Sequence, residues 1–106
     1  MGDTNEQLYT GVFGNDVVLT DSVRAAILAK HPEVAAFIDR LGVVLLSPDE
    51  VRQSVSDTRV VLYYQFRDEV LGGKWVAVVV KRVERHFVST AYATDRVKSG
   101  EVIWTK

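Results

Sequence analysis

The sequence contains no cysteine among its 106 residues, and this absence removes several classes of site. Disulfide scaffolds, thiolate zinc sites, iron–sulfur clusters and cysteine nucleophiles are all excluded. Histidine is scarce as well, because only His31 and His86 are present. The two histidines lack any spacing typical of a metal-binding helix, so we predict no metal site and no cofactor.

Long apolar runs and phosphate-binding loops are also missing. The longest apolar segments, residues 43–46 and 75–80, are far too short to cross a bilayer, and residues 1–10 lack the pattern of a secretory signal. We therefore expect a cytoplasmic protein that makes no membrane contact. The string Gly72-Gly73-Lys74 precedes a predicted strand rather than a helix, which favours a hairpin turn over a nucleotide-binding loop.

The length and the hydrophobic content of 47% predict a single domain spanning residues 1–106, in which we expect residues 1–7 to be frayed. The net charge of −1 provides no overall field that attracts a polyanion. The charges are uneven, however, with 4 basic and 9 acidic residues in 1–57 but 9 basic and 5 acidic residues in 58–106. The cations of the second half are therefore candidates for phosphate contacts, or they guard the edges of a sheet.

The first half of the chain is predicted to begin with a short hairpin and a helix. Residues 9–13 and 17–19 flank the turn-forming string Gly14-Asn15-Asp16, which is typical of a hairpin. Thr20 or Asp21 can then cap a helix through a side-chain oxygen, and an alanine-rich segment continues this helix to about Lys30.

Two further helices are predicted after a break at His31. Pro32 disfavours the α conformation at His31 and suits the first turn of a new helix. Four apolar residues of that helix fall on one face: Val34, Phe37, Ile38 and Leu41. The string Ser47-Pro48-Asp49-Glu50 has the pattern of a capping box, which predicts a short helix to about Ser54.

The second half is rich in β-branched and aromatic residues, which favour strands. The alternation of side chains and the intervening turns predict strands at Thr58–Phe66, Lys74–Val83, Arg85–Thr94 and Glu101–Thr105. The sequence therefore predicts an α+β fold in which N-terminal helices pack on an antiparallel sheet of about four strands.

Several residues of these elements are candidates for chemistry. His31 can reach a cleft from its helix boundary, or it can serve only as a helix cap. Thr90 and Tyr92 share one face of a strand, where they could present hydroxyl donors or be ordinary strand residues. Lys81 and Arg82 have opposite parity, so one cation points to each face of the sheet.

Six short segments follow one another in an order typical of a known family: Val17–Asp21, Ile27–Glu33, Ser47–Val51, Tyr63–Tyr64, Val78–Lys81 and Ser89–Tyr92. In this order the chain resembles the phage-associated branch of the barnase–EndoU–colicin–RelE-like nucleases, over about residues 17–104. The resemblance implies N-terminal helices on a curved antiparallel sheet of barnase/RelE type. It also implies a metal-independent ribonuclease of toxin or phage-effector type, which cleaves RNA through attack by the ribose 2′-hydroxyl.

The resemblance assigns roles to individual residues as well. His31 is the acid or base, Lys81 stabilises charge on the phosphorane, and Thr90 and Tyr92 are hydrogen-bonding partners. Three further residues are candidates for RNA contacts: Arg59, Arg82 and His86.

The chain departs from the family pattern at Ala26. Relatives often have a histidine there, in a string of the form His-Ile-x-x-x-His-Pro. Either His31 suffices for catalysis, or His86 substitutes for the missing histidine, or the chain is an inactive relative that acts as a binding module. Such a module could form a homodimer through the apolar segment Val60–Phe66. A further hypothesis is a toxin whose basic sheet face is covered by an acidic inhibitor protein.

Overall fold

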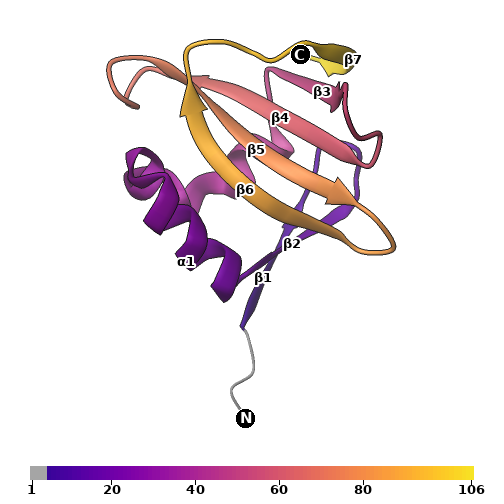
Figure 1. The fold of residues 1–106 in the computed structure, drawn as a ribbon, viewed down its shortest axis with the longest axis horizontal. Coiled ribbons are helices and arrows are strands. Elements are labelled where there is room, and N and C mark those ends of the chain that lie inside the picture. The colour runs from indigo at the N-terminus through magenta and orange to yellow at the C-terminus, as the bar shows by residue number, and fades with distance from the viewer. Residues whose placement is uncertain (1–4) are drawn as a thin grey trace.

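Seven strands form one mixed sheet in the computed structural model, which describes residues 5–106 (Figure 1). The strands are β1 (Glu6–Thr10), β2 (Asp16–Thr20), β3 (Glu50–Ser54), β4 (Val60–Arg67), β5 (Lys74–Arg82), β6 (His86–Thr94) and β7 (Gly100–Thr105). They lie in the order β1-β2-β6-β5-β4-β3-β7. Of the neighbouring pairs in residues 5–106, β2–β6 alone is parallel. The edges of the sheet are therefore β1 and β7.

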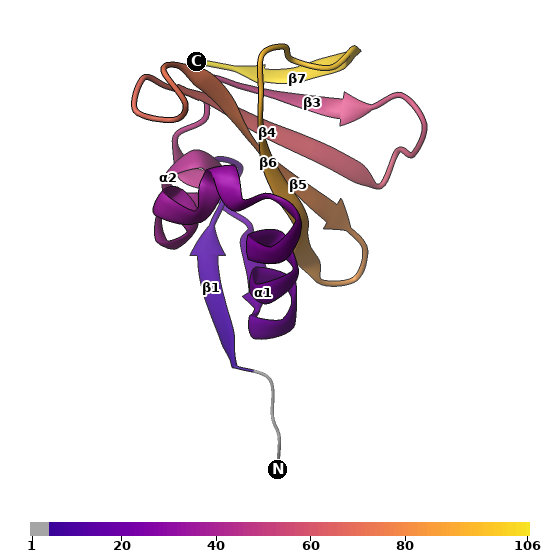
Figure 2. The same ribbon diagram turned by 60° about the vertical axis from the view of Figure 1, so that its left-hand side comes forward.

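The helical elements pack against one face of this sheet (Figure 2). They are α1 (Asp21–Lys30), the 3-10 helix η1 (Pro32–Arg40) and α2 (Leu41–Leu46). The β1–β2 hairpin lies on the same side, where the Val12 amide donates to the carbonyl oxygen of Leu45 over 2.8 Å. We call the covered side the helix face and the other side the open face.

The main core fills the helix face. The sheet contributes alternate side chains of its central strands, which are fully buried: Val61, Tyr63, Val76, Val78, Val80 and Val88. The predicted apolar stripe of the second helix is confirmed, because its four members are buried in the same core. A smaller cluster of Leu62, Tyr64 and Ala77 lies on the open face. The central strands thus carry buried side chains on both faces, although helices pack on only one of them.

Most of the elements predicted from short sequence patterns are present in the structure. The Thr20 side chain caps α1 by accepting from the Val23 amide over 3.3 Å, as predicted. The predicted break at His31 is confirmed as well, since α1 ends there and η1 begins at Pro32. The predicted hairpin near residues 9–19 and the four strands of the second half are all present within one to three residues of their predicted bounds.

The predicted fold class is wrong. The chain does not pack its helices on about four antiparallel strands, because its sheet has seven strands and is mixed. The β1–β2 hairpin joins the sheet through a short parallel contact, in which Val18 is aligned with Phe87. The α-helices are correspondingly short, with 10 residues in α1 and 6 in α2.

The predicted helix at residues 47–54 is also wrong, because this segment contains β3. Its backbone pairs with β4 on one side and β7 on the other, and Val51 is fully buried between them. A capping box stabilises a helix end by about 1 kcal/mol, which is less than two strand partners and a buried valine provide. The Asp49 carboxylate bonds to a strand instead of a helix end, because it accepts from the Phe66 amide of β4 over 2.8 Å.

Two smaller predictions also need correction. The segment Val60–Phe66 lies in β4, which has strands on both sides and is no edge for a homodimer. Glu6 and Gln7, predicted to be frayed, belong to β1, whereas residues 1–4 lie outside the described residues. Within residues 5–106, every helix is too short or too polar to span a membrane.

Candidate functional site

Three neighbouring strands present an ordered array of side chains on the open face. Because directly paired residues project to the same side of a sheet, the strand register defines rows across β4, β5 and β6. The rows that matter here are Phe66–Trp75–Thr94, Tyr64–Ala77–Tyr92 and Leu62–Val79–Thr90. We call them the upper, middle and lower rows.

His31 lies beside the middle row although it comes from the junction of α1 and η1. Its ring centroid is 5.8 Å from that of Tyr92, with the two planes inclined by 41°. The break that Pro32 imposes is the local cause, because it turns the chain at His31 towards β6. The structure therefore brings together His31 and Tyr92, two residues predicted for one site.

Glu33 fixes this arrangement to the sheet. Its Oε2 atom lies 3.4 Å from His31 Nδ1 and accepts from the Ala93 amide over 3.3 Å. The Ala93 amide is available because β2 pairs with β6 only around Phe87. A carboxylate at Nδ1 orients the imidazole and leaves Nε2 for chemistry. Glu33 was not predicted for the site, since its contact with β6 depends on tertiary packing.

The hydroxyl of Tyr92 is the most unusual polar group of the site. It is buried and makes no hydrogen bond of normal geometry within residues 5–106, although the Tyr64 hydroxyl lies close enough to interact with it. Burial raises the pKa of Tyr92, and it also raises that of Tyr64 in the same row. Buried hydroxyls normally have a well-formed hydrogen bond, and the ring that bears this one lies beside His31, so Tyr92 is a candidate for a functional role.

Lys98, an exposed residue of the β6–β7 loop, supplies a positive charge to this group. Its Nζ atom lies 5.7 Å from the centre of the Tyr92 ring. The Lys98 amide donates to the Tyr64 hydroxyl over 3.1 Å, which holds the β6–β7 loop over the middle row. The pattern of the sequence carried no signal for this contact, because the loop residue and Tyr64 are 34 positions apart.

Thr90 and Lys81 lie on the same open face but farther along it. Thr90 belongs to the lower row, next to the row of Tyr92. Lys81 is four residues along β5 from Ala77, which places its backbone about 13 Å from the middle row. Lys81 is therefore not a neighbour of His31, and it can contact only a ligand that extends along the strands.

The other predicted RNA contacts do not join this site. Arg82 and His86 are paired residues whose parity places them on the helix face. The Asn15 amide nitrogen lies 3.0 Å from His86 Nδ1, while burial and then Arg82 lower the pKa of His86. His86 is thus separated from His31 by the sheet, so it cannot replace the histidine missing at Ala26.

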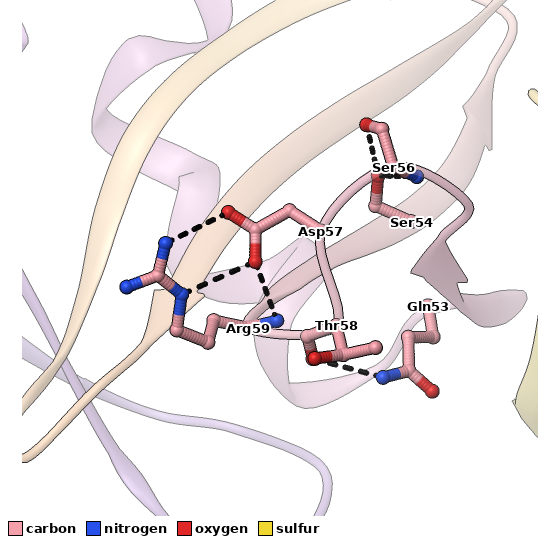
Figure 3. A network of polar contacts seen from close by, with 6 residues as sticks. All are labelled: Gln53, Ser54, Ser56, Asp57, Thr58 and Arg59. Carbon is pink, nitrogen blue, oxygen red and sulfur yellow. Dashed lines mark hydrogen bonds and ion pairs between the residues drawn. The ribbon is translucent and has the colours of Figure 1, made fainter.

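Arg59 is held in the β3–β4 turn by Asp57, two residues before it (Figure 3). Its guanidinium forms two contacts of 3.2 Å with the Asp57 carboxylate, and its amide donates to the same side chain over 2.9 Å. These bonds with Arg59 lower the pKa of Asp57. Arg59 therefore stabilises a turn, and its charge is largely compensated.

Ion pairs compensate much of the basic half. Five of its cations contact a carboxylate: Arg59, Arg67, Lys74, Arg85 and Lys106. Four cations of residues 58–106 form no ion pair with another described residue: Lys81, Arg82, Arg96 and Lys98. Two of the four, Arg96 and Lys98, are on the β6–β7 loop beside the candidate site, whereas Lys81 lies farther along the open face.

Other features of the site are simpler. Ala26 is exposed on α1, where a larger side chain would be tolerated. Within residues 5–106, no three potential ligands of the histidine, aspartate and glutamate types converge on a point that could hold a metal ion. The arrangement offers an oriented imidazole, an orphaned phenol and a nearby ammonium, which are the groups required for proton transfer beside an anion.

Comparisons with protein-family models, with curated proteins and with solved structures found no match for this chain. The candidate site therefore depends on its geometry alone.

Proposed function

We propose that the protein is a metal-independent ribonuclease whose active site is the group formed by His31, Glu33, Tyr92 and Lys98. The observation that carries this proposal is the position of the His31 ring, which lies 5.8 Å from the Tyr92 ring with Glu33 at its Nδ1 atom. An imidazole held by a carboxylate beside an unsatisfied donor is suited to move a proton at a phosphodiester.

The reaction follows from these groups. His31 Nε2 takes the proton of a ribose 2′-hydroxyl, whose oxygen attacks the adjacent phosphorus. The bond from phosphorus to the 5′-oxygen breaks, and the leaving oxygen takes a proton from water. The products are a 2′,3′-cyclic phosphate and a 5′-hydroxyl. Once substrate binding exposes the Tyr92 hydroxyl, which is buried in the free protein, it donates to a phosphate oxygen, and Lys98 offsets the negative charge that develops there.

The first experiment is cleavage of mixed cellular RNA by the purified protein in the presence of EDTA. We expect cleavage to survive chelation. Tyr92→Phe should lower the rate by about tenfold or more, because a donor to the transition state is lost. The free energy of unfolding of this variant should equal or exceed that of the wild type, because the variant lacks a buried hydroxyl that makes no hydrogen bond of normal geometry.

Lys98→Ala and Lys30→Ala form a matched pair, since both remove one exposed lysine. The Lys98 variant should cleave more slowly, whereas the Lys30 variant should cleave like the wild type. Equal rates for both variants would remove Lys98 from the site. Absence of any cleavage by the wild-type protein at micromolar concentration would favour the inactive binding module.

A role as a toxin or phage effector and a cytoplasmic location are also parts of this proposal. The toxin role is supported by the sequence resemblance, and the cytoplasmic location is the expectation drawn from the short apolar segments of the sequence. Expression in a bacterial host tests the toxin role, because an active enzyme should arrest growth and His31→Ala should relieve the arrest.

A further inference from the structure

The upper row of the open face contains an aromatic pair that the proposed chemistry does not use. Phe66 is 45% exposed, and its ring lies 5.5 Å from that of Trp75 at an angle of 79°. Trp75 in turn packs edge-on against Tyr64 at 6.4 Å. What distinguishes Phe66 from other exposed apolar residues is its ring contact with Trp75 on the open face, beside the row of Tyr64 and Tyr92.

Gly73 also contributes to the position of the Phe66 ring. Gly73, with a φ of 111°, lies under its ring, and a Cβ atom there would come within 3.2 Å of Phe66 Cζ. The glycine therefore provides both the turn and the space for the ring. Phe66 is backed by Gly73 and Trp75, so its exposed face is a preformed surface rather than a flexible side chain.

Positive charge runs beside this surface along the β6–β7 loop. The backbone of Arg96 is fixed next to the upper row, since the Thr94 hydroxyl accepts from its amide over 3.3 Å and donates to its carbonyl oxygen over 3.1 Å. Lys98 follows beside the middle row, and neither cation forms an ion pair with another described residue. The acidic residue of the loop, Asp95, is paired with Lys74.

The spacing connects this surface to the proposed active site. The upper and middle rows are two residues apart along the strands, a separation of about 7 Å. A planar ligand on Phe66 would thus lie next to the Tyr92–His31 pair, with Arg96 and Lys98 along the side. Aromatic rings on a sheet flanked by cations match the bases and phosphates of a single strand of nucleic acid.

We propose that Phe66 and Trp75 form a stacking platform that binds an unpaired base next to the scissile phosphate, which makes single-stranded RNA the substrate class. This inference rests on the proposed ribonuclease function. A base-paired strand cannot use the platform, because its bases are already stacked within the duplex.

The test measures binding separately from cleavage. The probe is a fluorescein-labelled single-stranded DNA of about eight nucleotides, a length in the range of single-strand sites, which lacks the 2′-hydroxyl and cannot be cut. Phe66→Leu removes the π surface and keeps an apolar side chain. Phe13→Leu is the matched control, because Phe13 is 46% exposed and packs against Tyr63 of the helix face. Thermal unfolding verifies that both variants are folded.

We expect Phe66→Leu to weaken binding of the probe by about five- to a hundredfold, the effect of losing one stacked base, and Phe13→Leu to leave it unchanged. A duplex of the same sequence should bind more weakly than the single strand. Equal affinity for the wild-type protein and Phe66→Leu, or equal losses in both variants, would overturn the platform. RNA cleavage by the wild type then separates the two proposals, since cleavage with an unaffected Phe66→Leu variant keeps the enzyme and rejects the platform.

Discussion

The two histidines of the chain occupy opposite faces of the sheet and have opposite kinds of neighbour. His31 has the Glu33 carboxylate at its Nδ1 atom and the Tyr92 ring beside it. His86 has the neutral amide of Asn15 at its Nδ1 atom. The carboxylate orients the imidazole through an ionic contact, whereas the amide holds it through a neutral hydrogen bond.

The wider surroundings sharpen this difference. Burial and the charge of Arg82 both lower the pKa of His86, so that histidine is held in its neutral form. His31 instead lies near the open face, where a ligand can approach. The comparison teaches that two identical side chains differ in their capacity for catalysis because their surroundings differ. The partner at Nδ1 determines which of the two can act as a base.

The largest expected effect comes from removing each histidine in turn. His31→Ala should lower the rate of RNA cleavage by at least about a hundredfold, because the general base is lost. His86→Ala should change the rate by less than about threefold, since the sheet separates it from the site. Rates on a labelled RNA with EDTA present measure both. Comparable losses in the two variants would contradict the comparison.

The second effect concerns the anchor of His31. Glu33→Gln preserves the length of the side chain and its bond to the Ala93 amide but removes the charge at Nδ1. Loss of a charge-assisted contact predicts a rate about ten- to a hundredfold lower, with a changed dependence of kcat/KM on pH. A purely structural role of Glu33 would instead lower the melting temperature and leave the shape of the pH profile as in the wild type.

A smaller effect is expected on the side of His86. Asn15→Ala removes the amide nitrogen that contacts His86 Nδ1 together with an amide oxygen that is buried without a partner, so it should lower the free energy of unfolding by no more than about 1 kcal/mol, without slowing cleavage. Urea denaturation gives the first quantity and the RNA assay gives the second. A variant that is as stable as the wild type but cleaves slowly would place His86 in the function rather than in the fold.

The smallest effect is a dependence of stability on pH. The pKa of His86 is lowered in the folded state, so the unfolded chain binds the proton first as the pH falls through about 6.5. The folded state then loses stability from about pH 7 downwards. His86→Gln should therefore lose less stability than the wild type between about pH 7.5 and pH 5. Identical pH slopes for the two proteins would show that burial of His86 has no such effect.

Much of the fold could be predicted from local signals. Thr20 and Pro32 define the ends of the helical segments through bonds and clashes within a few residues, and alternating side chains identify β4, β5 and β6. The capping pattern before Val51 was misleading. It favours a helix, but β4 and β7, which come later in the sequence, pair with the backbone of this segment and make it a strand. The parallel contact of β2 with β6 has no local signal, and it changed the fold class.

The candidate site shows the same division. His31, Thr90 and Tyr92 could be selected from a helix break and from strand parity, which are properties of neighbouring residues. Glu33 and Lys98 could not, since their roles depend on an unpaired amide in β6 and on the path of a loop across β4. Strand parity could separate Lys81 from Arg82 but could not tell how far Lys81 lies from His31, because parity gives the direction of a side chain and not its position along the sheet.

The central claim is that His31 activates a ribose 2′-hydroxyl. It is tested most directly with a single-stranded DNA oligonucleotide that contains one ribonucleotide, incubated with the protein in EDTA and analysed by mass spectrometry. The account predicts one cut, directly 3′ of the ribonucleotide, with a 2′,3′-cyclic phosphate on one product and no cut with His31→Ala. Cleavage within the DNA, an intact oligonucleotide, or the same products with His31→Ala would contradict it.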